Sequence, residues 1–302
     1  MGDDAVYHFR QMTRKRRIYW CSLYLLLLFF AAFFVTRICS ALITYSEVAG
    51  LSEYSEESDE FRDMKISQEN LKGVLECADE ISIPFHECLA AVMVMKRFDF
   101  SEADILDGKQ IIRVRNLLLD KKADSFERLA SAYEIIFSDL EYYPVPKNCN
   151  QGKKEQSSFE NDYGEARDYG GKRSHEGIDI FGTENLEGYY PIVSVTDGVV
   201  EKIGWLTLGG YRIGIRSPHG GYFYYAHLSG YCKEFQEGDQ VKAGELLGFM
   251  GNTGYGPEGT KGKFPVHLHF GIYINTSHQK EMSINPYPVL LMLKKKIQKY
   301  HY

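Results

Sequence analysis

The chain has 302 residues, of which 44% are hydrophobic and 25% are charged, with a formal net charge of −6 at pH 7. These proportions are ordinary for a folded protein and leave room for two modest domains plus appendages. The acidic balance argues against nucleic acid as a partner, because domains that bind nucleic acid are usually basic.

The N-terminal region has the pattern of a membrane anchor. A tail over residues 1–17 is rich in Arg and Lys, and the run Ile18–Thr36 that follows contains no charge. As a helix this run would be about 28 Å long, enough to cross the hydrocarbon core of a bilayer. The apolar core of a cleaved signal peptide is usually shorter, about 7–15 residues. The pattern therefore predicts a single-pass signal-anchor over 18–43, with the N-terminus cytoplasmic and the rest of the chain outside. A cleaved signal is the alternative.

Two segments separate the anchor from the C-terminal half. Residues 44–63 are rich in Glu, Asp and Ser, which is typical of a solvated linker. Helical patterns follow over 64–143: Ser67 can cap one helix and Pro84 suits the first turn of the next. The stretch Asp124–Glu127 resembles a capping box. We expect a small all-helical domain here, as a spacer or as a contact site for a protein partner.

Beyond a polar linker at 144–158, glycines, aromatics and β-branched residues dominate. Short strand-like runs at near-regular spacing, with no helix between them, predict an antiparallel sheet. A last helical pattern runs from Asn285 to Tyr300. The fold class is therefore α+β: a transmembrane helix, a small all-α domain, and an antiparallel sheet domain over 159–302 with a C-terminal helix. The predicted strands are Tyr190–Val195, Gly198–Trp205, Tyr211–Arg216, Tyr222–His227, Leu246–Met250 and Val266–Ile274.

Two short stretches in this last region carry metal-ligating side chains. His175 and Asp179 lie four residues apart, and His267 and His269 lie two apart. Even spacing along a strand places side chains on one face. Zinc binds imidazole nitrogen and carboxylate oxygen, and a catalytic site keeps three protein ligands and one open position. His175, Asp179 and His269 supply that set.

Other interpretations of these stretches are weaker. Either stretch alone is compatible with ordinary surface or core histidines, but together, among apolar runs and glycines, they favour a metal site. The helical zincin motif begins correctly at His175 and Glu176, but Asp179 stands where that motif needs its second histidine.

Residues 157–290 resemble the lysostaphin-type, or LytM-domain, zinc peptidases, which cut peptide bonds in bacterial peptidoglycan. The matching pieces occur in the order of the family and are separated along the chain. They are Gly164 with Arg167, His175 with Asp179, Val195–Val200, Tyr225–Leu228, Gly238–Gly244, Gly251–Gly254 and His267 with His269.

The resemblance implies an antiparallel β-sheet groove with zinc on its floor, held by His175, Asp179 and His269. His267 and His227 would be the two catalytic histidines that do not bind the metal. Tyr169 is a candidate donor to the oxyanion.

The function expected from the resemblance is a membrane-anchored zinc endopeptidase acting on stem or cross-link peptides of peptidoglycan at the outer face of the membrane. The alternative is a non-catalytic member of the same fold, serving as a scaffold or as an activator of another wall hydrolase. Such members typically lack ligand or catalytic histidines, whereas all five positions are filled here.

Overall fold

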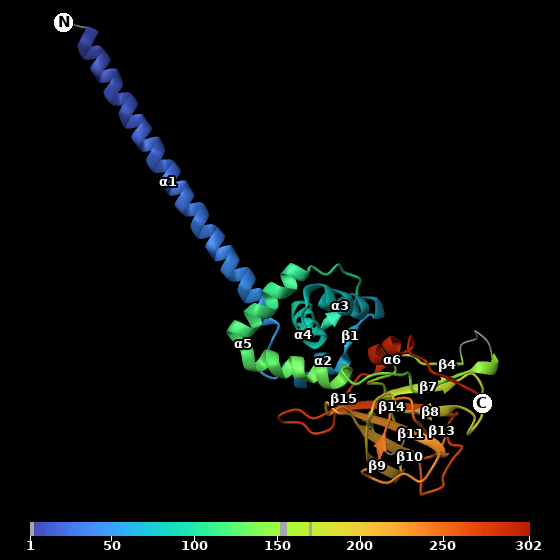
Figure 1. The fold of residues 1–302 in the computed structure, drawn as a ribbon. Coiled ribbons are helices and arrows are strands. Elements are labelled where there is room, and N and C mark those ends of the chain that lie inside the picture. Colours follow the sequence, from blue (N-terminus) through green and yellow to red (C-terminus); the bar gives the residue numbers. More distant parts are fainter. Residues whose placement is uncertain (1–2, 152–155, 169–170) are drawn as a thin grey trace. The chain divides into compact units, whose positions relative to one another are not determined.

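The computed structural model describes residues 3–151, 156–168 and 171–302 (Figure 1). The chain divides between Ala49 and Gly50 into two compact units. The first consists of the helix α1, Asp3–Ala49. Its segment Ile18–Ile43 has 26 residues and a mean hydropathy of 2.3, so it is long and apolar enough to cross a membrane, although a signal sequence near the N-terminus meets the same criterion.

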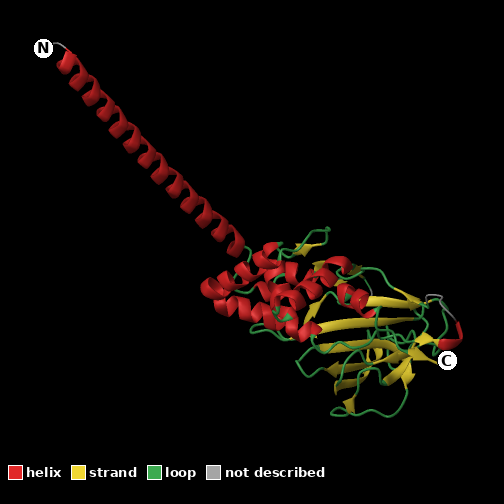
Figure 2. Cartoon of the chain, turned by 45° about the horizontal axis from the view of Figure 1, so that its top comes forward, coloured by secondary structure: helices red, strands yellow, loops and turns green. Residues whose placement is uncertain are grey.

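Helices form the N-terminal part of the second unit, residues 50–302 (Figure 2). The side chain of Ser67 caps α3 by accepting a hydrogen bond from the backbone N of Asn70 at 3.2 Å. Seven consecutive residues of α4, Cys88–Val94, are buried, which places this helix at the centre of the helical core. Lys122 breaks the regular geometry of α5, with φ −147° and ψ 44°, close to the predicted helix start at Asp124. These elements are α2 (Asp59–Asp63), β1 (Lys65–Ile66), α3 (Gln68–Ile81), α4 (Phe85–Met95), β2 (Asp99–Phe100) and α5 (Gly108–Phe137).

The segment expected to be a solvated linker is partly buried. Leu51 and Phe61 are fully buried, and Glu56 is 2% exposed. A carboxylate oxygen of Glu56 lies 2.8 Å from Nε of Arg128 on α5. The average composition of the segment is acidic, but its apolar residues join the core, and Arg128 on α5 pairs with one of the two oxygens of the buried Glu56. The finer division of residues 50–302 into a helical and a peptidase domain stays a prediction.

Among the described residues, the C-terminal part forms an antiparallel sheet of ten strands. The strands follow the order β12-β9-β10-β11-β14-β7-β4, with β13 paired to β11 and β8, and β15 paired to β14. All six strands predicted from the sequence are present. The strands are β4 (Ser157–Ser158), β7 (Ile178–Gly182), β8 (Pro191–Val193), β9 (Gly198–Leu206), β10 (Gly210–Arg216), β11 (Tyr222–Tyr231), β12 (Gln240–Val241), β13 (Leu246–Met250), β14 (His267–Ile274) and β15 (Met282–Ile284).

The two faces of the central strands differ sharply in chemistry. On β11, Phe223 and Tyr225 are fully buried in the core, whereas Tyr222 and Tyr224 line a groove on the opposite face. On β14, Leu268, Phe270 and Ile272 are likewise buried, and His267, His269 and Tyr273 line the groove. Strand alternation thus separates an apolar core face from a face rich in His, Tyr and Arg.

The C-terminal helix is shorter than its sequence pattern. The helix α6 covers Tyr287–Leu293, whereas the pattern extends from Asn285 to Tyr300. Beyond it, β16 (Lys299–Tyr300) pairs in parallel with β3 (Lys147–Asn148), and the Tyr300 hydroxyl donates to the Gly244 carbonyl at 2.9 Å. These tertiary contacts outweigh the local preference for helix.

Candidate active site

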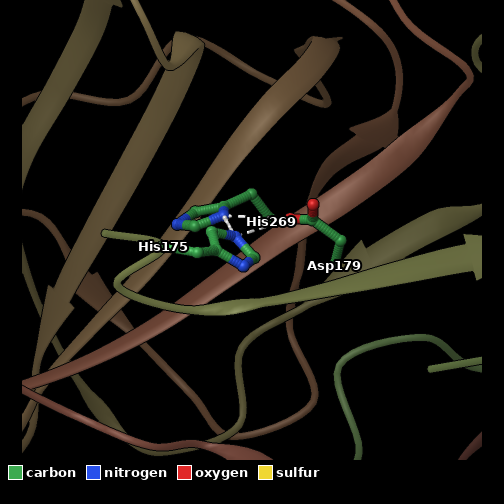
Figure 3. Close-up of side chains that lie close together, drawn as sticks. All are labelled: His175, Asp179 and His269. Carbon is green, nitrogen blue, oxygen red and sulfur yellow. Dashed lines mark hydrogen bonds and ion pairs between the residues drawn. The ribbon is translucent and has the colours of Figure 1, made fainter. Parts of the chain in front are cut away.

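Three side chains from neighbouring parts of the sheet converge on one point (Figure 3). Asp179 on β7 and His269 on β14 lie opposite each other in the strand register. His175 lies in the loop between β6 (Arg173–Ser174) and β7. Nε2 of His175 is 2.9 Å from Nδ1 of His269 and 3.1 Å from Oδ1 of Asp179, and Nδ1 of His269 is 3.0 Å from that same oxygen. The register of β7 with β14 and the loop that carries His175 therefore bring all three predicted ligands together.

The chemistry of this donor set fits zinc. Two imidazole nitrogens and one carboxylate oxygen form a nearly equilateral triangle. Such a triangle is the base of a tetrahedral site whose fourth position is open. Zinc–ligand bonds of about 2.0–2.2 Å give ligand–ligand separations of about 3.3 Å, slightly wider than those observed. The group thus has the donor types, the number and nearly the spacing that a catalytic zinc requires.

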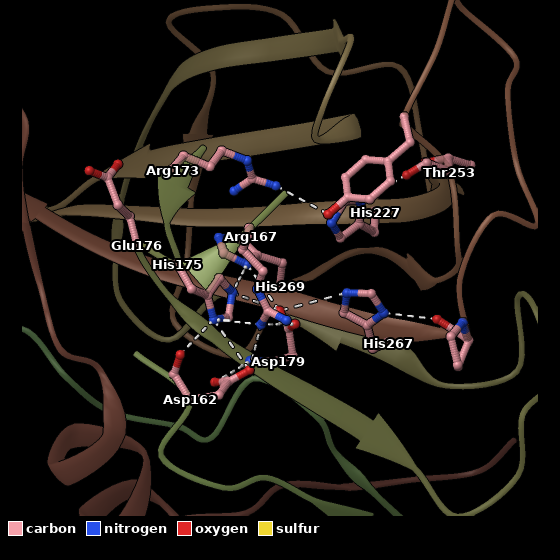
Figure 4. A network of polar contacts seen from close by, with 12 residues as sticks. Asp162, Arg167, Arg173, His175, Glu176, Asp179, His227, Thr253, His267 and His269 are labelled. Carbon is pink, nitrogen blue, oxygen red and sulfur yellow. Dashed lines mark hydrogen bonds and ion pairs between the residues drawn. The ribbon is translucent and has the colours of Figure 1, made fainter. Parts of the chain in front are cut away.

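A second set of side chains orients the proposed ligands (Figure 4). Nη2 of Arg167 donates to Asp179 Oδ2 at 3.0 Å and to Asp162 Oδ2 at 2.9 Å. Arg167 therefore holds the outer oxygen of Asp179 and leaves Oδ1 facing the two histidines. Nδ1 of His175 lies 3.0 Å from the Asp162 carbonyl. Nη2 of Arg167 lies 2.8 Å from the same nitrogen. The carbonyl can only accept and the guanidinium can only donate, so the two contacts make opposite demands on Nδ1. Binding of a metal through Nε2 requires the proton on Nδ1, which the Asp162 carbonyl can accept.

The charges of the cluster are strongly coupled. Burial disfavours a protonated His175, but its hydrogen bonds to Asp162 and Asp179 outweigh burial and raise the pKa of His175 to about 9. Burial of Asp179 is likewise outweighed, by His175 and His269, so the pKa of this carboxyl lies well below its usual range. A bound cation would take over the role of the proton between these groups, so metal binding should release protons.

His267 and His227 lie beside the triangle with their rings 4.8 Å apart. Nδ1 of His267 is 2.8 Å from the Pro265 carbonyl, and Nδ1 of His227 is 2.8 Å from the Thr253 carbonyl. Each carbonyl fixes a proton on Nδ1, which leaves a bare Nε2. Burial lowers the pKa of both histidines, and the neighbouring His267 lowers that of His227 further. Both rings are therefore neutral bases near pH 7.

His227 reaches this position through an irregularity in β11. Strict alternation after the buried Tyr225 would turn His227 towards the core. Between Tyr225 and Leu228 the pairing of β10 with β11 shifts register, as an extra residue in a β-bulge does. His227 also has φ 60°, in the left-handed region, and its backbone N donates to the Gly209 carbonyl at 2.8 Å. The bulge and this conformation together place the imidazole beside Thr253 on the groove face.

The site lies in a groove of about 980 Å³. The sequence motifs include Arg167 but indicate no role for its side chain. They do not include Asp162 or the groove residues Arg173 and Arg212. Asp162 and Arg212 have no regular spacing to the histidines, and Arg173, two residues before His175, lies in a strand of only two residues. The predicted oxyanion donor, Tyr169, lies outside the described residues, so its role stays a prediction.

Comparisons with known proteins agree with this geometry. The model of peptidase family M23 matches residues 173–286. The crystal structure of a LytM protein from Ruminococcus gnavus is 37% identical, with a TM-score of 0.69, over 81% of this chain and 94% of that one. The chain belongs to peptidase family M23. This confirms the predicted family and the predicted antiparallel fold.

Two curated M23 relatives extend the comparison. An L-Ala–D-Glu endopeptidase of Bacillus subtilis is 42% identical over 165 residues, which make up 55% of this chain and 47% of the relative. Lysostaphin of Staphylococcus simulans is 32% identical over 118 residues, 38% of this chain and 21% of the relative. The chain thus spans about half the length of the first relative and a smaller part of the second.

Proposed function

We propose that this M23 peptidase is a zinc-dependent endopeptidase that hydrolyses peptide bonds of peptidoglycan at the outer face of the cell membrane. The observation that carries the proposal is the convergence of His175, Asp179 and His269 beside two neutral histidines in one groove. Neither the three proposed ligands nor the two histidines would be sufficient alone. Metal-assisted hydrolysis of an amide uses a Lewis acid that polarises the carbonyl and a base that takes a proton from water.

The chain supplies the following chemistry. His175, Asp179 and His269 would hold zinc, which polarises a scissile carbonyl and lowers the pKa of water towards about 7. His267 and His227 hold their protons on Nδ1, so either Nε2 can accept a proton from the attacking water and return it to the leaving amine. Nε2 of His267 lies 3.6 Å from Asp179 Oδ1, so His267 is the base nearer to the proposed ligands. Water and the amide are consumed, and a carboxylate and an amine are formed.

The bond to test first is one between alanine and glutamate. The Bacillus subtilis relative named for the L-Ala–D-Glu bond matches more residues, at higher identity, than lysostaphin does. The proposed location rests on Ile18–Ile43, which is long and apolar enough to span a membrane, and on the basic tail before it.

The decisive experiment uses the full-length protein in detergent. Zinc content and the release of new amino termini from purified peptidoglycan are measured for the wild type and for His267→Ala. We expect His267→Ala to retain zinc and to lose cleavage. A matched control is His219→Ala, an exposed histidine in the hairpin between β10 and β11, which should cleave normally. Cleavage by His267→Ala at the rate of the wild type would refute the assigned role, and a wild type that binds zinc without cleaving would favour the scaffold alternative.

The location is tested separately by membrane fractionation. The intact protein should stay with the membrane in high salt and leave it in detergent. A soluble form that begins near residue 42 would show that the apolar segment is a cleaved signal instead.

A further inference from the structure

The groove contains two positive charges that no described residue neutralises. Two of its cations are paired. Arg167 pairs with the carboxylates of Asp162 and Asp179. Lys202 pairs with Glu237, whose Oε2 lies 3.4 Å from Nζ of the lysine. Arg173 and Arg212 form no ion pair with any described residue. The cationic side chains that line the groove are Arg167, Arg173, Lys202 and Arg212.

Both unpaired guanidinium groups also have buried nitrogens that lack an acceptor. Nε of Arg173 and Nη1 of Arg212 are shielded from solvent and make no hydrogen bond within the described residues. The Arg173 side chain donates a hydrogen bond from Nη2 to the Tyr255 hydroxyl, at 3.1 Å. These nitrogens are closed off from the groove as well as from solvent, so what the groove offers a ligand is the guanidinium charge, which no described carboxylate compensates.

The strand register explains why Arg212 has no partner across the sheet. Arg212 on β10 lies opposite Gly204 on β9, which has no side chain. On its other side, β10 pairs with β11 so that Gly214, two residues further on, lies opposite Tyr224. Alternation therefore directs Arg212 to the groove face, beside Tyr224.

Both arginines lie one aromatic ring away from the proposed reaction centre. The ring of Tyr224 is 5.9 Å from that of His269, and the ring of Tyr255, which Arg173 contacts, is 6.0 Å from that of His227. Arg212 shares a face of the sheet with Tyr224, and Arg173 donates to the Tyr255 hydroxyl. Both guanidinium groups thus border the reaction centre through an aromatic side chain.

We propose that Arg212 and Arg173 form a carboxylate subsite, which binds the free carboxylate of a glutamate next to the scissile bond. This inference rests on the proposed endopeptidase function. A guanidinium group presents N–H donors in a planar fork that matches both oxygens of a carboxylate. A glutamate acylated on its amine keeps one free carboxylate even when its other carboxyl group is in a peptide bond. An internal Gly–Gly bond has no such group, so the subsite selects for the acidic residue.

The test compares two synthetic peptides that differ in one functional group. Both contain the L-Ala–D-Glu bond, but in one the free carboxylate is converted to the amide. For the zinc-loaded full-length wild type, kcat/KM should be about 10- to 100-fold higher for the acid than for the amide, the range expected for hydrogen bonds to a charged group. Arg212→Met and Arg173→Met should each reduce this ratio, mainly by slowing hydrolysis of the acid peptide.

Lys202→Met is the matched control, because it removes a groove cation that already has a carboxylate partner. It should keep the acid-to-amide ratio of the wild type. The subsite is refuted if the wild type hydrolyses both peptides equally, if Arg212→Met slows both by the same factor, or if Lys202→Met loses the preference as fully as Arg212→Met. Zinc content and thermal midpoint identify a variant that has simply misfolded.

A binding measurement separates the subsite from the proposed function. Calorimetry on the zinc-loaded wild type should show tighter binding of the acid peptide, and Arg212→Met should abolish the difference. If the wild type cleaves neither peptide but binds the acid selectively, the endopeptidase proposal fails and the subsite stands. Equal affinity for the two peptides overturns the subsite whether or not cleavage occurs.

Discussion

Replacing Gly177 with alanine should both destabilise the fold and weaken the metal site. A Cβ atom at this position would lie 2.6 Å from Cε1 and 2.7 Å from Nε2 of His269, and 2.7 Å from the Phe270 carbonyl oxygen. These contacts are far inside van der Waals separation. The carbonyl belongs to the backbone of β14 and cannot rotate away, so His269 and its strand must shift. Overpacking of this kind typically costs about 1–3 kcal/mol, which for a unit of this size lowers the thermal midpoint by about 2–12 °C.

The assay pairs Gly177→Ala with Gly230→Ala. A Cβ at Gly230, on β11, would have no atom within 4 Å. Because alanine loses less backbone freedom than glycine on folding, Gly230→Ala should be neutral or stabilising by up to about 1 kcal/mol. Zinc affinity, measured by competition with a chromophoric chelator, should fall about tenfold or more for Gly177→Ala. Equal thermal midpoints for the two variants, with unchanged zinc affinity, would refute the reasoning.

Two further predictions concern stability outside the site. Asp139, two residues after the end of α5, accepts a hydrogen bond from His219 Nδ1 at 2.7 Å and raises the pKa of His219. The stabilisation from this raised pKa is present below the unfolded pKa and is lost as pH rises through the folded one. His219→Gln should therefore lower the free energy of unfolding at acidic pH, by only about 0.5 kcal/mol because the side chain is 47% exposed. This difference should vanish at alkaline pH, where His219 is neutral in both states. A difference that persists there contradicts the ion pair. The buried hydroxyl of Tyr133 has no partner in the described part of the chain, whereas that of Tyr225 accepts from Val195 N at 2.9 Å. In denaturant unfolding, Tyr133→Phe should be neutral or stabilising, and Tyr225→Phe should cost about 1–3 kcal/mol; the reverse order would show that the two hydroxyls are wrongly assigned.

The arrangement of the proposed ligands was accessible from the sequence because it depends on local periodicity. Strand spacing alone puts His267 and His269 on one face of β14. Asp179 lies opposite His269 in the register between β7 and β14. Two strands that pair in register then bring these residues together. His175 lies just outside β7, so its place depends on the loop rather than on alternation, and here the resemblance to a family was the stronger guide.

His227 marks the limit of periodicity. Counting alternate residues along β11 from the buried Tyr225 would assign His227 to the core face. The bulge that reverses this assignment arises where β11 pairs with β10, and the backbone N of His227 bonds to Gly209. Partner strands are not visible in the local pattern of a single strand. The resemblance could name His227 as catalytic, but its orientation required the paired structure.

The two arginines of β10 show why the proposed subsite could not be found from the sequence. Arg212 and Arg216 are four residues apart on one strand, so alternation gives them the same face. Arg216 meets a carboxylate, with Nη2 donating to Glu201 at 2.7 Å, whereas Arg212 lies opposite Gly204. Two arginines on the same face of β10 thus differ in the residue that β9 places beside them: a glutamate beside Arg216 and a glycine opposite Arg212. The register between β9 and β10 neutralises one charge and leaves the other for a ligand, and the acid and amide peptides measure the consequence of that difference.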